Sequence, residues 1–462
     1  MPIGNLDVPV IGKNVVIASL VQTHILFAAF IIGAVLIAAT SEYLGMVTKQ
    51  PYYERFARNL ARFVVLLFAS GAALAITFVL ALVTLFPVFF SILQNIFFWV
   101  FLVEAFMFLG QIIIVYAWYN VWDKLAYRKS LHVVFGFVAG FFGLMAMTMI
   151  DAVASFMLTP AEVESQAELV ARSFLNQTMV PLNMHRFVGN ISFAGFLVAG
   201  YGAVRYLRST REDDREYYDW MGHWGLIWGF GFLLLQPLVG YGYMKAIREH
   251  NAAAFDYIML GDKAWLFNLL AIELAVMSVA AVAYCLHKLK FAVKPMPTLR
   301  NMTMGSLGFM VIFSFLNIIP SDWYLVPQIG LVFGERVPPD ISLAEPTPVP
   351  LGAMYPWKFI GLIGMMLVGI FALGMYLKAT TDGFHWGRAS RWSQHALIAT
   401  AVTVILTMPT MGYTRETARR GGDPPDGSDG YLIQGCLTLA QNVVAADCPN
   451  APEQTPERGR FP

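Results

Sequence analysis

Ten apolar stretches, each about as long as a membrane-spanning helix, recur along the 462-residue chain. A helix needs about 20 mostly apolar residues to cross the hydrocarbon core of a bilayer. The stretches of this length are residues 15–40, 63–92, 97–120, 133–158, 183–205, 221–244, 264–286, 303–320, 356–378 and 395–413. The sequence therefore predicts an all-α membrane protein, a polytopic bundle of about ten transmembrane helices.

Composition agrees with a chain embedded in lipid. The residues are 57% hydrophobic and only 13% charged, and the mean hydropathy is +0.59, which is far outside the range of soluble proteins of this length. The net charge of +1 gives no reason to expect nucleic acid as a partner. No basic cluster or cleavage site precedes the first stretch, so we expect it to be kept as a helix.

The basic residues predict the orientation in the membrane. Lys and Arg gather in the loops after the odd-numbered stretches, whereas residues 159–182 carry three glutamates. By the positive-inside rule, both termini are expected outside.

Three regions divide the chain. We expect a first half at 1–245 with six spans, a second half at 246–420 with an ordered external loop at 321–355, and an external tail at 421–462. Cys436 and Cys448 both fall in the tail, where a disulfide between them is the favoured reading and two free thiols are the alternative.

Two histidines are candidate heme ligands. His24 lies about two turns into the first stretch, and a buried imidazole in hydrocarbon needs a partner, of which heme iron is the commonest in respiratory membranes. His185 opens the fifth stretch at the same predicted depth, and Arg186 beside it can pair with a heme propionate. The alternative for these two residues is a position at the membrane interface.

Carboxyl groups inside the spans are the next candidates. Glu104 and Gln111 are two turns apart, so they share one face of the third helix. Glu104 is expected to conduct protons or face a heme, unless it forms an interhelical hydrogen bond. Asp151 and Glu273 also lie within spans, and Lys358 stands near the start of the ninth; each can form a helix-to-helix pair.

A further carboxylate follows the last span. Glu416 stands among Arg415, Arg419 and Arg420, which should keep it ionised. It can ligate iron through oxygen while the arginines hold propionates. A surface ion-pair cluster is the alternative.

The order and spacing of these residues resemble the large subunit of cytochrome bd-type quinol oxidases. The similar features are His24, Gly33 and Glu42 at nine-residue intervals, the segment Tyr53 to Ala57, Glu104 and Gln111 before Trp122-Asp123-Lys124, Asn183-Met184-His185, and Glu416-x-x-Arg419. The similarity covers about the first 245 residues and the last two spans.

The resemblance implies a site for up to three hemes, b-type with a d-type heme as a further option. His24 and Glu416 match ligands of the high-spin pair, His185 matches a ligand of the low-spin heme, and Glu104 matches a glutamate beside the pair on the proton side. Arg419, Arg186 and Lys358 are assigned to heme propionates. A second, related membrane subunit is expected as partner, in a bacterial cytoplasmic membrane with both termini periplasmic.

Three departures from the family also stand in the sequence. Gln111 replaces a second glutamate and cannot exchange a proton. Ile360 aligns with the methionine that is the second ligand of the low-spin heme, and it cannot ligate iron. Two apolar stretches, 264–286 and 303–320, replace the long hydrophilic quinol-binding loop, which makes a c-type cytochrome an alternative donor to quinol.

The sequence thus predicts a heme-binding subunit of a bd-like oxidase, an oxidoreductase that reduces oxygen to water with Glu104 in the proton route. One alternative is a heme b electron-transfer subunit of a larger respiratory complex that does not reduce oxygen. A second is a heme-free transporter or scaffold that uses Glu104, Asp151 and Glu273 for ion coupling.

Overall fold

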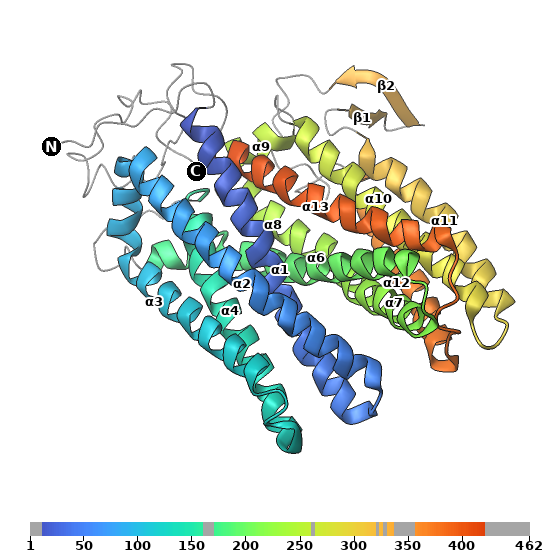
Figure 1. Cartoon of the computed structure of the whole chain (residues 1–462). Coiled ribbons are helices and arrows are strands. Elements are labelled where there is room, and N and C mark those ends of the chain that lie inside the picture. The colour runs from blue at the N-terminus through green and yellow to red at the C-terminus, as the bar shows by residue number, and fades with distance from the viewer. Residues whose placement is uncertain are drawn as a thin grey trace. The chain divides into compact units, whose positions relative to one another are not determined.

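The computed structural model describes residues 12–159, 171–259, 264–319, 323–326, 330–336 and 356–420. These residues are helical apart from two short strands and the connecting turns (Figure 1). Ten of the helical segments are long and apolar enough to cross a membrane. The predicted all-α bundle with ten spans is therefore confirmed.

The helices follow one another with short connections. Their bounds are α1 Lys13–Thr48, α2 Pro51–Leu85, α3 Pro87–Asn120, α4 Lys129–Phe156, α6 Met179–Arg208, α7 Glu212–Leu233, α8 Gln236–His250, α9 Ala252–Met259, α10 Ala264–Lys288, α11 Pro297–Ile318, α12 Pro356–Asp382 and α13 Arg391–Arg420. Two 3-10 turns, η1 Ala126–Arg128 and η2 Leu289–Phe291, precede α4 and follow α10.

The boundary expected between the second and third spans was wrong. The apolar run 63–92 suggested one helix through residue 92, but α2 ends at Leu85 and α3 begins at Pro87. Proline fits the first turn of a helix and cannot donate the hydrogen bond that would continue the preceding one. Hydrophobicity alone does not reveal this break, because both sides of it are apolar.

The sixth span is likewise two helices. The α-helical assignment stops after Leu233 and resumes at Gln236, with Pro237 in the first turn of α8. The short helix α9 then follows after Asn251. One apolar stretch in the sequence thus contains a break that turns the chain.

Two compact units make up the chain, and each is discontinuous in sequence. The first unit contains Met1–Phe187, Gly242–Phe255 and Arg415–Pro462, and the second contains Val188–Tyr241 and Asp256–Thr414. In the first unit α1 packs on α2 and α4, and α3 packs on α2 and α4; in the second, α10, α11 and α12 pack together, with α7 against α10 and α12. The division into halves at residue 245 stays a prediction.

A two-stranded hairpin lies in the segment expected to be an ordered loop. Strands β1 Trp323–Val326 and β2 Gly330–Arg336 pair antiparallel, with Leu325 opposite Leu331. The remainder of the loop 321–355 and the tail with Cys436 and Cys448 lie outside the described residues.

Candidate functional site

His24 lies on α1 close to the crossing with α2. The backbone of Gly71 on α2 lies beside its ring, and an added Cβ on Gly71 would touch Phe27 and Ile31 of α1 at 3.6 Å. The Nδ1 atom is buried and has no hydrogen-bond partner among the described residues. The ring is thus held between two helices without its full complement of polar contacts.

His185 lies in the first half of α6 within the same unit. Its ring stacks on Tyr243 of α8, with centroids 5.8 Å apart and planes 28° from parallel. This stacking orients the imidazole plane, which is a requirement for any ligand to a heme iron.

Arg186, the next residue, makes an ion pair with the fully buried carboxylate of Asp151 on α4. Asn183 donates a second hydrogen bond to Asp151 at 3.0 Å and a third contact to Thr148 at 3.1 Å. The α6 start is therefore fastened to α4 by charge and amide contacts directly beside His185.

Glu104 and Gln111 lie on α3, and their surroundings differ. Glu104 is half-buried, whereas Gln111 is 4% exposed and its Nε2 atom has no hydrogen-bond partner in the described part of the chain. The amide packs against the backbone of Gly143 on α4, where an added Cβ would lie 2.2 Å from Nε2. A neutral amide in this tight position cannot serve as a proton carrier.

Glu416 lies half-buried in the last turns of α13. Arg415, which precedes it, donates a hydrogen bond to the carbonyl oxygen of Ala154 on α4. The side chain of Arg419 lies outside the described residues. Arg415 therefore connects the end of α13 to the unit that contains α4.

The three expected iron ligands come from distant parts of the sequence and belong to one unit. His24 is on α1, His185 on α6 and Glu416 on α13, and all three fall in the first unit. Within the described ranges no three His, Cys, Asp or Glu side chains gather around a common point. Isolated ligands suit a heme iron, since the porphyrin supplies the other four.

Lys358 and Ile360 lie in the second unit. Lys358 is fully buried, and its Nζ atom donates to Asn268 Oδ1 at 2.9 Å and to the carbonyl of Asn317 at 3.0 Å. Ile360 is 50% exposed.

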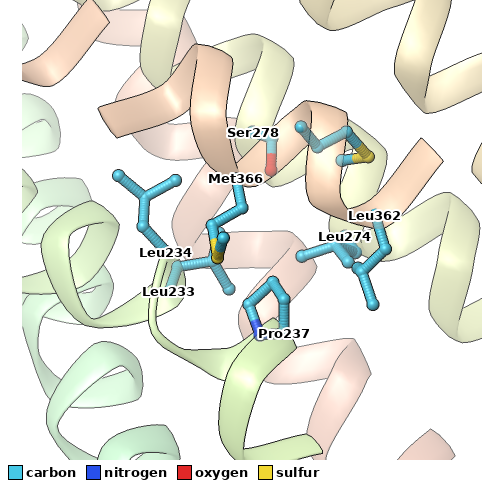
Figure 2. A pocket seen from close by; sticks show the side chains of 8 residues that line it. Leu233, Leu234, Pro237, Leu274, Ser278, Leu362 and Met366 are labelled. Atoms are coloured by element: carbon cyan, nitrogen blue, oxygen red, sulfur yellow. The ribbon is translucent and has the colours of Figure 1, made fainter. Parts of the chain in front are cut away.

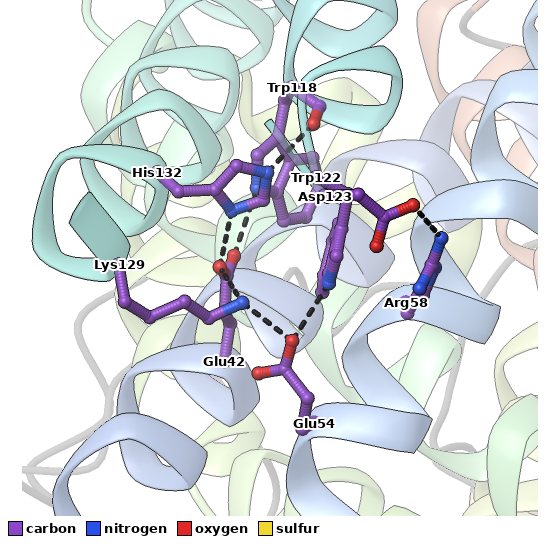
Figure 3. A network of polar contacts seen from close by, with 8 residues as sticks. All are labelled: Glu42, Glu54, Arg58, Trp118, Trp122, Asp123, Lys129 and His132. Atoms are coloured by element: carbon purple, nitrogen blue, oxygen red, sulfur yellow. Dashed lines mark hydrogen bonds and ion pairs between the residues drawn. The ribbon is translucent and has the colours of Figure 1, made fainter. Parts of the chain in front are cut away.

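A charged network at one end of the first unit was missed by the sequence reasoning (Figure 3). Glu42 of α1 is fully buried and bonded to Nδ1 of His132 on α4. Trp118 Nε1 donates to Glu42 at 2.9 Å, and Lys129 Nζ lies 2.8 Å from Glu42 and 2.6 Å from Glu54. His132 was expected at the membrane interface, and this was wrong because its carboxylate partner holds it inside.

The protonation of this network follows from its geometry. His132 Nε2 lies 2.8 Å from the carbonyl oxygen of Trp118, and a carbonyl can only accept. Nε2 therefore carries a hydrogen, and one more proton is shared between Nδ1 and Glu42. Only the motif position of Glu42 hinted at the network, since its partner is 90 residues away in the sequence.

A small apolar pocket lies in the second unit (Figure 2). It is lined by Leu233, Leu234, Pro237, Leu274, Ser278, Leu362, Met365 and Met366, and its volume is about 10 Å³. That is roughly the room of one water molecule. The pocket as it stands does not hold a porphyrin.

Comparison with known proteins decides the family. A sequence model described as cytochrome bd terminal oxidase subunit I matches residues 15–421, which is most of the chain. The chain belongs to the cytochrome bd terminal oxidase subunit I family.

The fold of this bd-family chain is also that of a solved relative. It is similar to the bd oxidase from Geobacillus thermodenitrificans, with 16% sequence identity and a TM-score of 0.59, covering 94% of this chain and 95% of the other. Among curated proteins, none matches the sequence significantly. The family and the fold are thus shown, while this bd-family member diverges strongly in sequence.

Proposed function

We propose that the chain is the heme-binding subunit of a bd-like terminal oxidase, which passes electrons to a heme site that reduces oxygen to water. The match over residues 15–421 carries this proposal, since it includes His24, His185 and Glu416. The proposal is supported by the presence of all three residues in one compact unit.

The residues fit heme in most respects. His24 offers an imidazole with a buried, unpartnered Nδ1 atom, His185 offers one oriented by Tyr243, and Glu416 offers a carboxylate held near α4 through Arg415. A bound heme would supply the electron storage and the oxygen chemistry. Arg186, Arg419 and Lys358 would compensate the negative propionates.

One position does not fit. Ile360 has no atom that can bind iron, and it is half-exposed. We therefore derive no second ligand for the heme at His185 from this position.

Proton supply would start from Glu104 in this proposal. The neighbouring Gln111 cannot take over, because an amide does not exchange a proton at neutral pH. Gln111 and Ile360 together favour a second candidate function, a heme b subunit that transfers electrons in a larger respiratory complex without reducing oxygen.

The partners in this proposal are a second membrane subunit, with further subunits of a respiratory complex, and an electron donor. Helices α10 and α11 fill the sequence region of the family's quinol-binding loop, which favours a c-type cytochrome over a quinol as donor. The setting proposed is a bacterial cytoplasmic membrane with both termini periplasmic.

The test is the heme content of the purified protein, measured by reduced-minus-oxidised spectra and pyridine hemochrome analysis. We expect His24→Ala, His185→Ala and Glu416→Ala each to lose part of the heme signal, because each removes an axial ligand. His250→Ala and Glu249→Ala are matched controls, since both residues are exposed at the end of α8.

Two outcomes bear on the function. Unchanged heme content in all three ligand variants would contradict the site. Rapid reoxidation of reduced heme by oxygen in the wild type supports the oxidase, and heme that oxygen does not reoxidise supports the electron-transfer subunit.

A further inference from the structure

Glu273 is a carboxyl group inside the membrane span formed by α10. It lies nine residues after Ala264, in a helix that is otherwise apolar at its centre. Its exposed fraction is 6%. An ionised side chain at such a depth costs at least about 2.5 kcal/mol, so its presence calls for a physical reason.

Helix α13 carries a row of hydroxyl groups along one face. Residues seven apart are two turns apart and share a face of a helix. The hydroxyl face of α13, as we name it, consists of Ser393, Thr400, Thr403, Thr407, Thr410 and Thr414. It spans most of the length of the helix.

The hydroxyl face of α13 points into the protein. Ser393, Thr400 and Thr414 are buried, and the other three are half-buried. The opposite face is exposed and apolar, with Val402, Ile405, Leu406 and Tyr413 each 43–56% exposed. The hydroxyl groups are therefore shielded on the side that lipid would cover.

Glu273 joins the middle of this face. Thr410 Oγ1 donates to Glu273 Oε1 at 2.9 Å and also lies 3.0 Å from the carbonyl of Leu406. The other oxygen, Oε2, is buried and has no hydrogen-bond partner among the described residues. Pro409, next to Thr410, has no N–H, so the helix lacks one backbone bond at this level.

Charged and titratable groups on the packed helices are bonded elsewhere. Lys358 of α12 is bonded to Asn268, which lies five residues before Glu273 and thus about 7.5 Å along α10. Tyr376 of α12 is bonded to His223 of α7 at 2.6 Å. The part of α11 from Asn301 to Ile318 and the part of α13 from Ala396 to Gly412 contain no charged residue.

A carboxyl with no cation beside it can stay buried only when it carries a proton. The simplest alternative is a permanent structural hydrogen bond to Thr410, as small polar residues often make between membrane helices. That alternative would use one hydroxyl group and leave Oε2 unsatisfied. It does not account for hydroxyl groups over four further turns of the same face.

We propose that Glu273 and the hydroxyl face of α13 form a proton-carrying site within the membrane. Glu273 binds a proton at Oε2, and on release the O–H bond breaks and the proton passes to a water molecule along the hydroxyl groups. The site would offer an exchangeable carboxyl in a chain whose α3 has Gln111 at the family's second glutamate position. Only the use of the proton for oxygen reduction rests on the proposed function.

The test is site-resolved labelling with dicyclohexylcarbodiimide, which adds to protonated carboxyl groups in apolar surroundings. The full-length protein in lipid nanodiscs is labelled over a pH series from about 5 to 9, and the peptides are analysed by mass spectrometry. We expect an adduct on Glu273 that falls as the pH rises, and its loss in Glu273→Gln.

Two threonine variants sharpen the test. Thr410→Val removes a hydrogen bond that stabilises the carboxylate, so labelling of Glu273 should persist to higher pH. Thr77→Val is the matched control, because this α2 hydroxyl is bonded only to the carbonyl of Ala73 in its own helix and should leave the profile unchanged.

The infrared C=O band of a protonated carboxyl is measured on the same samples, in case the reagent does not reach the site. No adduct and no band that disappears in Glu273→Gln would overturn the proposal. Labelling that is independent of pH but blocked by Na⁺ would also overturn it in favour of a metal-cation site. Both readouts are independent of heme, so a heme-free protein that labels at Glu273 would sink the oxidase proposal alone.

Discussion

Glu42 and His132 are both fully buried, and each satisfies the other. Lys129 and Trp118 complete the contacts of the carboxylate. Removing one partner from such a group is costly because the remaining charge stays in a medium of low dielectric constant. The network is thus a place where single substitutions should have large effects.

The first prediction compares this pair with an exposed one. We expect His132→Ala to lower stability by about 3–5 kcal/mol, since it leaves Glu42 without its buried partner. Asp123→Ala should cost about 1 kcal/mol or less, because the Arg58–Asp123 side chains are 49% and 77% exposed. Apparent melting temperatures in detergent, recorded by intrinsic fluorescence, measure both.

Equal shifts of melting temperature in the two variants would contradict the assignment of the Glu42–His132 pair as the stabilising contact. The sequence could not have indicated this pair. Its local pattern placed His132 near the end of a span, and the partner that buries it comes from α1, far away along the chain.

At the scale of helices, close backbone contact decides which residues can be exchanged. Gly195 of α6 lies against Gly229 of α7, and Ser192 donates to the Gly229 carbonyl at 2.7 Å. Glycine at membrane helix crossings permits such approach, and the van der Waals attraction between the closely packed backbones stabilises the pair. The crossing is rigid because both partners are backbone.

The second prediction tests this crossing. In Gly195→Ala the new Cβ would lie 2.2 Å from the backbone nitrogen of Gly229, so the helices must separate. We expect a strong loss of folded protein in fluorescence-detected size-exclusion chromatography. Gly374→Ala on α12 has no atom within 4 Å of the new Cβ and should keep or gain stability by up to about 1 kcal/mol.

A folded Gly195→Ala protein with an unchanged melting temperature would show that α6 and α7 do not approach so closely. Element positions were largely predictable, because ten apolar stretches of the right length can only be helices in lipid. Their ends were less so. The α2 and α3 boundary at Pro87 falls inside a continuous apolar run, where a hydropathy pattern carries no signal.

For the whole molecule, the basic loops predict one orientation across the membrane. Tyr127, between α3 and α4, is 78% exposed, and Trp392, at the start of α13, is 77% exposed. Both fall in regions expected on the cytoplasmic side, and His250 falls on the opposite side.

The third prediction follows from this orientation. In a background without native cysteines, Tyr127→Cys and Trp392→Cys should react with a membrane-impermeant maleimide only in inverted vesicles. His250→Cys should react only in right-side-out spheroplasts. Labelling of Tyr127→Cys and Trp392→Cys from opposite sides would contradict the even number of spans expected between their two loops.

The family and the fold could be predicted from motif spacing in the sequence, since His24, His185 and Glu416 occur in a characteristic order. The polar contacts around these residues could not. Arg186 with Asp151, Lys358 with Asn268 and Glu273 with Thr410 each join helices far apart in sequence, and which pairs form depends on packing that no local pattern records.

The discontinuous build of the first unit has a consequence for biosynthesis. Its last segment, Arg415–Pro462, leaves the ribosome only after every other helix has been made. A nascent chain that stalls before this point holds α1 to α4 without their final neighbour. Cofactor loading at Glu416 would therefore have to follow complete insertion of the polypeptide, and quality control could recognise truncated chains by their failure to become coloured.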